Sequence, residues 1–97
     1  MSLVCESKPQ KLLLITNYTM RIVAEITDKP CRITIFNWNN KYILKLEYGN
    51  YEQTYKVAAL DLGGDEDIKN CLSDDFINKV MHRFMAMEND LMEVLSL

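Results

Sequence analysis

The sequence predicts an α+β protein, in which a four- or five-stranded antiparallel meander is packed on one face by a long C-terminal helix. Apolar and polar residues alternate between Met20 and Val57, which indicates half-buried strands. Two residue pairs that favour tight turns, Asn39-Asn40 and Gly49-Asn50, divide this stretch into hairpins. After Ser73 the apolar residues recur at spacings of three and four, which indicates a helix.

Length and composition are those of one small folded domain over residues 1–97. The chain is 48% apolar and 26% charged, as in ordinary globular proteins. A domain of this size buries only about 60–65% of its unfolded surface, so we expect it to rely on a second subunit as a homodimer. The longest apolar runs, such as Leu12–Ile15, have four residues, far fewer than the roughly 20 residues of a membrane helix. We therefore expect a cytoplasmic protein that does not enter a membrane.

The strands are assigned in chain order. Residues 1–10 are polar and are expected to form a loose arm, and Lys11–Thr16 is a candidate first strand. The alternation of residues 20–26 predicts one face with Met20, Ile22, Ala24 and Ile26, and an opposite face with Arg21, Val23 and Glu25. Strands over Cys31–Trp38, Lys41–Tyr48 and Tyr51–Val57 complete a sheet that occupies residues 11–60.

The turn at Asn39-Asn40 predicts the register of the hairpin around it. A two-residue loop places Trp38 opposite Lys41 and Phe36 opposite Ile43, and likewise pairs Thr34 with Lys45 and Arg32 with Glu47. Side chains alternate between the two faces, so one face becomes almost wholly apolar. Its residues are Cys31, Ile33, Ile35, Tyr42, Leu44, Leu46, Tyr48, Tyr51, Tyr55 and Val57, together with Ile22 and Ala24.

A helical part over residues 65–95 is expected to cover that apolar face. A short helix over Asp65–Leu72 follows Gly63-Gly64, and a long helix is capped by Ser73 and continues to about Leu95. The long helix measures roughly 33 Å against roughly 25 Å for a strand, so its last two turns should extend beyond the sheet. We expect a dimer interface there, formed by Phe84, Met87, Leu91, Met92, Val94 and Leu95, with Leu97 adding to the apolar end.

The second face of the sheet is the candidate binding site. Toward the Thr27–Pro30 turn, Arg32 lies among Glu25, Glu47 and Glu52, which predicts a cross-strand ion ladder. Toward the Asn39-Asn40 turn, aromatic and basic residues gather: Arg21, Phe36, Trp38, Lys41, Ile43, Lys45 and Lys56. Exposed rings beside cations bind single-stranded nucleic acid by stacking and phosphate contacts. The alternative is a second hydrophobic cluster that is covered by the N-terminal segment or by a protein partner.

Charge and reactive residues narrow the function classes. Residues 1–60 hold eight basic and five acidic residues, whereas residues 61–97 hold three and nine, so the strand region is basic and the helical region acidic. The single histidine, His82, has no sequence-evident catalytic partner. The three cysteines are widely spaced, and the acidic residues near Gly63-Gly64 lack the spacing of a calcium loop. The sequence therefore predicts a binding protein that is not an enzyme and has no catalytic residues, cofactor or metal.

At the level of topology, residues 20–95 resemble the single-stranded nucleic-acid-binding folds of the Pur, Whirly and transcriptional-coactivator type. The chain also resembles small bacterial proteins of the same architecture. In those nucleic-acid-binding folds a twisted four-stranded meander is followed by one long helix, and subunits often pair through such helices. The resemblance implies a homodimer that binds single-stranded DNA or RNA through its sheet.

Overall fold

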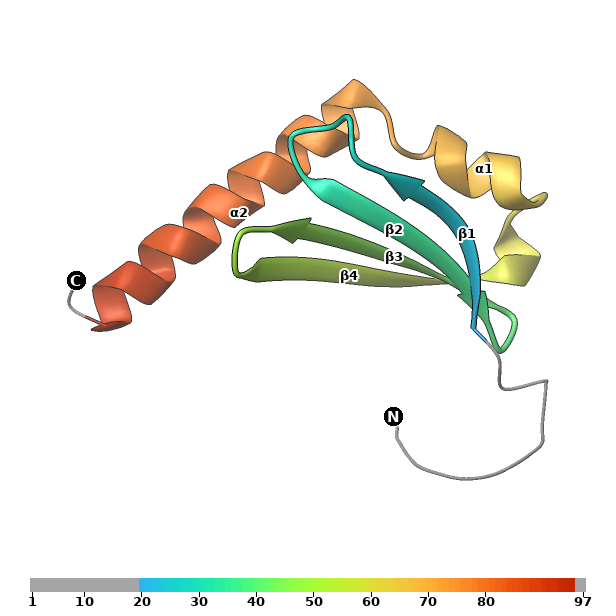
Figure 1. The fold of residues 1–97 in the computed structure, drawn as a ribbon, viewed down its shortest axis with the longest axis horizontal. Helices are drawn as coiled ribbons and strands as arrows, with labels where there is room; N and C mark the ends of the chain where they lie inside the picture. The colour runs from blue at the N-terminus through green and yellow to red at the C-terminus, as the bar shows by residue number, and fades with distance from the viewer. Residues whose placement is uncertain (1–19, 96–97) are drawn as a thin grey trace.

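The computed structural model describes residues 20–95, which form a four-stranded antiparallel sheet followed by helices (Figure 1). The strands lie in the order β1-β2-β3-β4 and are β1 (Arg21–Ile26), β2 (Arg32–Trp38), β3 (Lys41–Tyr48) and β4 (Tyr51–Ala58). They are followed by the 3-10 helix η2 (Ala59–Asp61), α1 (Asp65–Asn70) and α2 (Asp74–Leu95). The predicted α+β meander with a long C-terminal helix is confirmed. The expected arm, the candidate strand Lys11–Thr16 and Leu97 lie outside the described residues.

Both hairpin turns lie where the sequence predicted them, but they differ in type. Asn39 and Asn40 have φ of 54° and 61°, as a type I′ turn requires. In the β3–β4 hairpin only the first central residue, Gly49, has a positive φ, which is the type II′ pattern. Among residues 20–95, Asn39 and Asn40 are the only non-glycine residues with a positive φ. The β2–β3 pairing is the predicted one, from Trp38 opposite Lys41 to Arg32 opposite Glu47.

Strand β1 differs from the prediction because it contains a β-bulge at Val23. Ile22 pairs with Phe36, whereas Ala24 pairs with Ile35, so Val23 is an extra residue. Because of the extra residue, the side chains that precede it point to the opposite faces of the sheet from those predicted. The expected placement of Ile22 on the apolar face is therefore wrong: Ile22 lies on the opposite face and is 53% exposed. Ala24 and Ile26 lie on the apolar face as expected.

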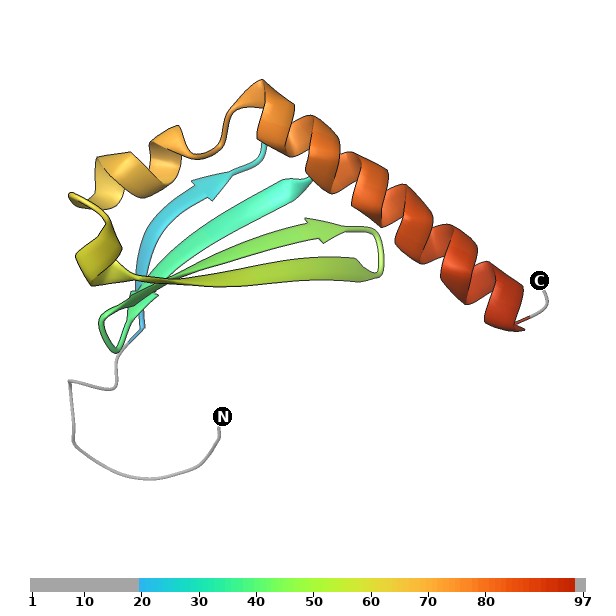
Figure 2. The same cartoon turned by 180° about the vertical axis from the view of Figure 1, so that it is seen from behind.

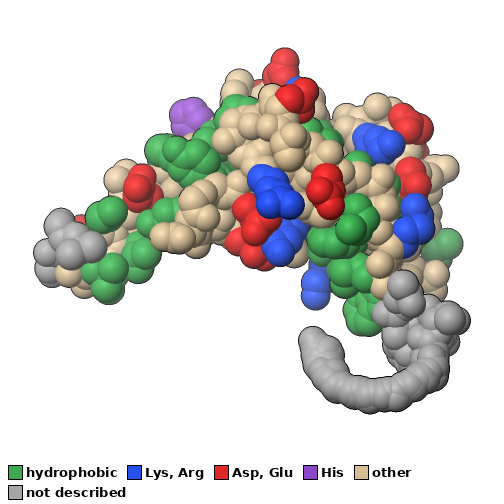
Figure 3. All heavy atoms as spheres, viewed as in Figure 1, with side chains coloured by type: hydrophobic (Ala, Val, Ile, Leu, Met, Phe, Trp, Pro, Cys, Tyr) green, Lys and Arg blue, Asp and Glu red, His purple; other side chains and the backbone are tan. Residues whose placement is uncertain are grey.

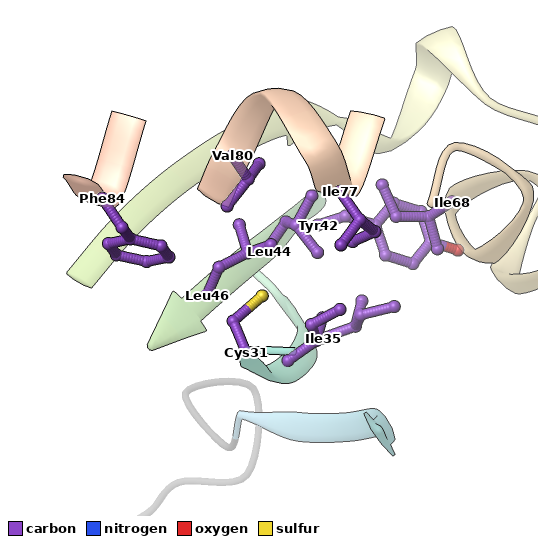
Figure 4. Close-up of a cluster of buried hydrophobic side chains, with 10 residues drawn as sticks. Cys31, Ile35, Tyr42, Leu44, Leu46, Ile68, Ile77, Val80 and Phe84 are labelled. Carbon is purple, nitrogen blue, oxygen red and sulfur yellow. The ribbon is translucent and has the colours of Figure 1, made fainter. Parts of the chain in front are cut away.

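The core lies between one face of the sheet and the two α-helices. Ile77, Val80 and Phe84 of α2 point toward Leu44 and Leu46 of β3 (Figure 4). The ring of Phe84 is fully buried, and its centroid lies 5.7 Å from that of Tyr48. Ile68 of α1 covers the end of the core near Tyr42 (Figure 4). Full burial of an aliphatic or aromatic side chain contributes roughly 1.5–3 kcal/mol, so this small cluster carries much of the folding free energy.

Helix α2 begins and ends as predicted. The Ser73 side-chain oxygen accepts a hydrogen bond of 3.1 Å from the Phe76 backbone N–H, which caps the helix. Its 22 residues span about 33 Å, whereas an eight-residue strand spans about 27 Å. The helix crosses the sheet toward the β4 side and projects past the β3–β4 hairpin, as views from both sides show (Figures 1 and 2). Within residues 20–95, no helix is long and apolar enough to span a bilayer.

Candidate binding surfaces

The first candidate surface is the projecting end of α2, residues 85–95. The apolar stripe that begins with Ile77, Val80 and Phe84 continues into this segment, but the sheet does not extend beneath the whole of it. Five large apolar side chains there are between 39% and 79% exposed: Met85, Leu91, Met92, Val94 and Leu95. A cluster of this kind at the end of a helix is the usual composition of a protein interface.

The structure divides the predicted dimer interface into two parts. Leu91, Met92, Val94 and Leu95 are exposed on the projecting end, where a partner can reach them. Phe84 belongs to the core of its own chain, so its side chain is not available to a partner. Met87 is partly buried against the same core and marks the boundary between the two parts.

The charged residues of the projecting end all have one sign. Glu88, Asp90 and Glu93 are its ionisable residues, and it contains no lysine or arginine. The nearest basic residue along the helix is Arg83, which precedes the projecting end. The segment therefore presents an apolar stripe beside carboxylates, and the apolar stripe is the part that a partner can cover.

The second candidate surface is the open face of the sheet, the face turned away from α2. Strand pairing sets its rows, of which the central one runs Ile22, Phe36, Ile43 and Lys56. Trp38 and Lys41 lie in the next row toward the Asn39-Asn40 turn. Over the strands, basic and acidic side chains intermingle, with hydrophobic side chains gathered beside them (Figure 3).

Five of the seven residues predicted for nucleic acid binding form a compact cluster on the open face. Phe36, Trp38 and Ile43 are partly buried there, and Lys41 and Lys56 are exposed at its rim. Within residues 20–95, neither lysine makes an ion pair. We call these five residues the aromatic–lysine cluster.

The other two predicted residues, Lys45 and Arg21, make contacts with carboxylates. The ammonium group of Lys45 lies 3.9 Å from carboxylate oxygens of both Glu47 and Glu52. Of the predicted ion ladder around Arg32, the structure shows the contact of 3.9 Å with Glu25, whereas Glu47 and Glu52 contact Lys45. Arg21 pairs with Asn37, which places it on the covered face of the sheet, so the prediction that it lies on the open face is wrong. The cause is again the bulge at Val23.

Arg21 instead forms a polar cluster that the sequence did not reveal. Its guanidinium donates two hydrogen bonds to Asp65 at the start of α1, of 3.2 and 3.3 Å. The Tyr42 hydroxyl donates a third to the same carboxylate, at 2.7 Å. The hydrogen bonds from Arg21 and then Tyr42 lower the pKa of Asp65, and the bond to Asp65 raises the pKa of Tyr42. This cluster ties β1 and β3 to α1 and has a structural role.

The remaining reactive groups make no assembled chemical site in the described part of the chain. The Cys31 thiol is buried, and its desolvation raises the pKa, whereas Cys71 is exposed. Residues 20–95 contain no group of three or more metal-ligating side chains. A shallow hollow beside His82 is formed by the outer face of α2 alone. Comparison with protein-family models, curated proteins and solved structures found no match for this chain.

Proposed function

We propose that this protein is a non-enzymatic protein-interaction module that forms a homodimer through the projecting end of α2. One observation carries the proposal: five large apolar side chains stand exposed on a helix end that its own sheet does not reach. Burial of apolar area is the main favourable term in association. A symmetric dimer also covers the exposed patch of both subunits.

The charge of the projecting end favours a protein partner over a lipid surface. Helices that bind membrane surfaces carry lysine and arginine on their polar side, which attract anionic headgroups. Glu88, Asp90 and Glu93 would instead be repelled by such a surface. The apolar stripe and acidic flank are therefore better suited to a protein.

Sedimentation of the wild type and of Leu91→Asp combined with Val94→Asp tests the proposal. The wild type should be a dimer, and the double variant should be a folded monomer because both side chains are exposed in the subunit. Asn78→Asp combined with Asn89→Asp is the matched control. It adds the same charge to the polar side of the same helix, and the dimer should persist. A wild type that stays monomeric over a wide concentration range would contradict the proposal.

A second candidate function is the binding of single-stranded nucleic acid at the aromatic–lysine cluster. Lys41 and Lys56 lie at the rim of Phe36 and Ile43, which favours this function. Among the described residues, no carboxylate forms an ion pair with either lysine, whereas Lys45 is paired with Glu47 and Glu52. Bases stack on rings of this kind while phosphates meet the ammonium groups. The fold-level resemblance to the Pur, Whirly and transcriptional-coactivator type supports the same candidate. The oligonucleotide experiment in the Discussion tests it.

A further inference from the structure

The two edges of the sheet differ in how well they could accept another strand. Strand β1 has six residues and is interrupted by the bulge at Val23. Strand β4 has eight residues, contains no proline and pairs with β3 without any shift of register. Long, regular edge strands offer a row of unpaired backbone groups to another chain, whereas bulges hinder such pairing. Strand β4 is therefore the edge at which a further strand fits.

Alternate residues of β4 direct their backbone groups away from β3. In a two-residue hairpin the residues that flank the turn, here Tyr48 and Tyr51, are a hydrogen-bonded pair. The backbone N–H and C=O groups that point outward then belong to Glu52, Thr54, Lys56 and Ala58. All four residues are exposed, and within residues 20–95 the backbone of β4 makes no hydrogen bond to an element other than β3.

We propose that β4 pairs antiparallel with β4 of a second copy, around a two-fold axis at Thr54. In this register Glu52 of each copy, which also contacts Lys45 of its own subunit, lies opposite Lys56 of the other, so two ion pairs form across the new strand pair. Moving the axis by one residue removes both ion pairs. Moving it by two residues places Glu52 opposite Glu52 or Lys56 opposite Lys56. Charge therefore selects one register among those that the backbone groups allow.

The apolar side of β4 supports the same arrangement. Tyr51, Tyr55 and Val57 lie on the helix side of the strand, and each is only partly buried within its own subunit. In the proposed register Tyr51 lies opposite Val57 of the second copy, so both lose exposed surface.

This inference rests on the proposed function, since it describes how the two copies of the homodimer meet. One strand pair alone covers less than the roughly 800 Å² per partner of a standard interface. The projecting end of α2 extends past the β3–β4 hairpin on the β4 side of the sheet, so a copy added at β4 also lies within its reach (Figures 1 and 2). A two-fold axis normal to the sheet keeps the α2 helices of both copies on one face and the two open faces on the other.

Charge reversal tests the register. Glu52→Lys and Lys56→Glu should each weaken the dimer about tenfold or more in sedimentation equilibrium, because two attractions become two repulsions. The double variant should recover the affinity of the wild type, and an equimolar mixture of the two single variants should form heterodimers. Lys41→Glu is the matched control, since Lys41 lies on the same face but on the interior strand β3. Its dimer should be unchanged.

Disulfide cross-linking gives a second readout that does not depend on charge. Opposed Cα atoms of a hydrogen-bonded antiparallel pair, as Thr54 forms with its copy in this register, lie about 5.5 Å apart, which a disulfide can bridge. In a background with Cys5→Ser and Cys71→Ser, Thr54→Cys should give a covalent dimer on mild oxidation, and Lys41→Cys should not.

The outcomes separate the two proposals. A monomeric wild type would overturn both the homodimer and its strand pairing. A wild-type dimer that is lost with Leu91→Asp and Val94→Asp, but is unaffected by the charge reversals and not cross-linked at position 54, would overturn the strand pairing alone. Recovery in the double variant together with the Thr54→Cys cross-link would establish it.

Discussion

The two halves of α2 carry the same apolar stripe but differ in what covers it. In residues 74–84 the stripe faces the sheet, and Ile77, Val80 and Phe84 are buried. In residues 85–95 the stripe continues, but beyond Met87, which is partly buried against the core, its side chains are exposed. The periodicity is the same in both halves, so it shows which side of a helix is apolar and does not show what covers it. The two faces of the sheet differ in the same way: the helices cover one face, and the other is open.

The largest difference between the halves should appear on truncation of their apolar side chains. Phe84→Ala should lower the free energy of unfolding by about 3–5 kcal/mol, because it leaves a cavity in the core. Leu91→Ala should change the stability of the dilute monomer by less than about 0.5 kcal/mol. Chemical denaturation at low protein concentration measures both. Equal losses in the two variants would mean that both halves are covered within one subunit.

The two faces of the sheet should differ in binding, if the aromatic–lysine cluster takes single-stranded nucleic acid. An oligonucleotide should bind at low salt and dissociate as salt rises, and Trp38→Ala should weaken binding by about 1–3 kcal/mol. Lys41→Ala should reduce affinity and flatten the salt dependence. Lys45→Ala is its matched control and should have a smaller effect, since Lys45 already contacts Glu47 and Glu52. Failure of the wild type to bind at low salt would exclude this function.

The two hairpin turns offer a test of the register that assigns residues to the faces. Asn40→Val should destabilise the protein by about 1–2 kcal/mol, because a β-branched residue is strained at a φ of 61°. Asn50→Val should cost less than about 0.5 kcal/mol, since Asn50 does not have a positive φ. Thermal or chemical unfolding of both variants measures the difference. Similar losses would show that the two turns are of the same type.

The smallest expected effect is the pH dependence of the polar cluster that ties α1 to the covered face. The pKa of Asp65 is lowered in the folded protein, so its contribution is present above its ordinary value of 3.8 and is lost as the pH falls through the folded value. The pKa of Tyr42 is raised, so its contribution is complete below 10 and is lost as the pH rises through the folded value. Asp65→Asn should reduce the loss of thermal stability at both extremes. An unchanged profile would mean that other groups cause it.

The fold was predictable because it follows from local signals. The turns at Asn39-Asn40 and Gly49-Asn50, the cap at Ser73 and two periodicities are sufficient for the strand order and for the β2–β3 register. The bulge was not predictable, because the alternation of apolar and polar residues over 21–26 is equally compatible with a regular strand and with a bulged one. That single inserted residue moved Ile22 to the open face and Arg21 to the covered one.

The candidate surfaces were predictable in part for a related reason. Exposed apolar positions on α2 follow from helix length against strand length, and the structure confirms that exposure. The contact of Arg21 with Asp65 joins residues that are 44 positions apart, and no local pattern encodes it. One signal pointed toward it: a buried tyrosine such as Tyr42 generally needs a partner for its hydroxyl.

The central claim, that a second copy covers the projecting end of α2, is tested most directly by amide hydrogen exchange at increasing protein concentration. Protection of residues 74–84 should be nearly independent of concentration, because their cover belongs to the same subunit. Protection of residues 85–95 should rise with concentration as the dimer forms. Protection of residues 85–95 that does not change over the whole concentration range would contradict the claim.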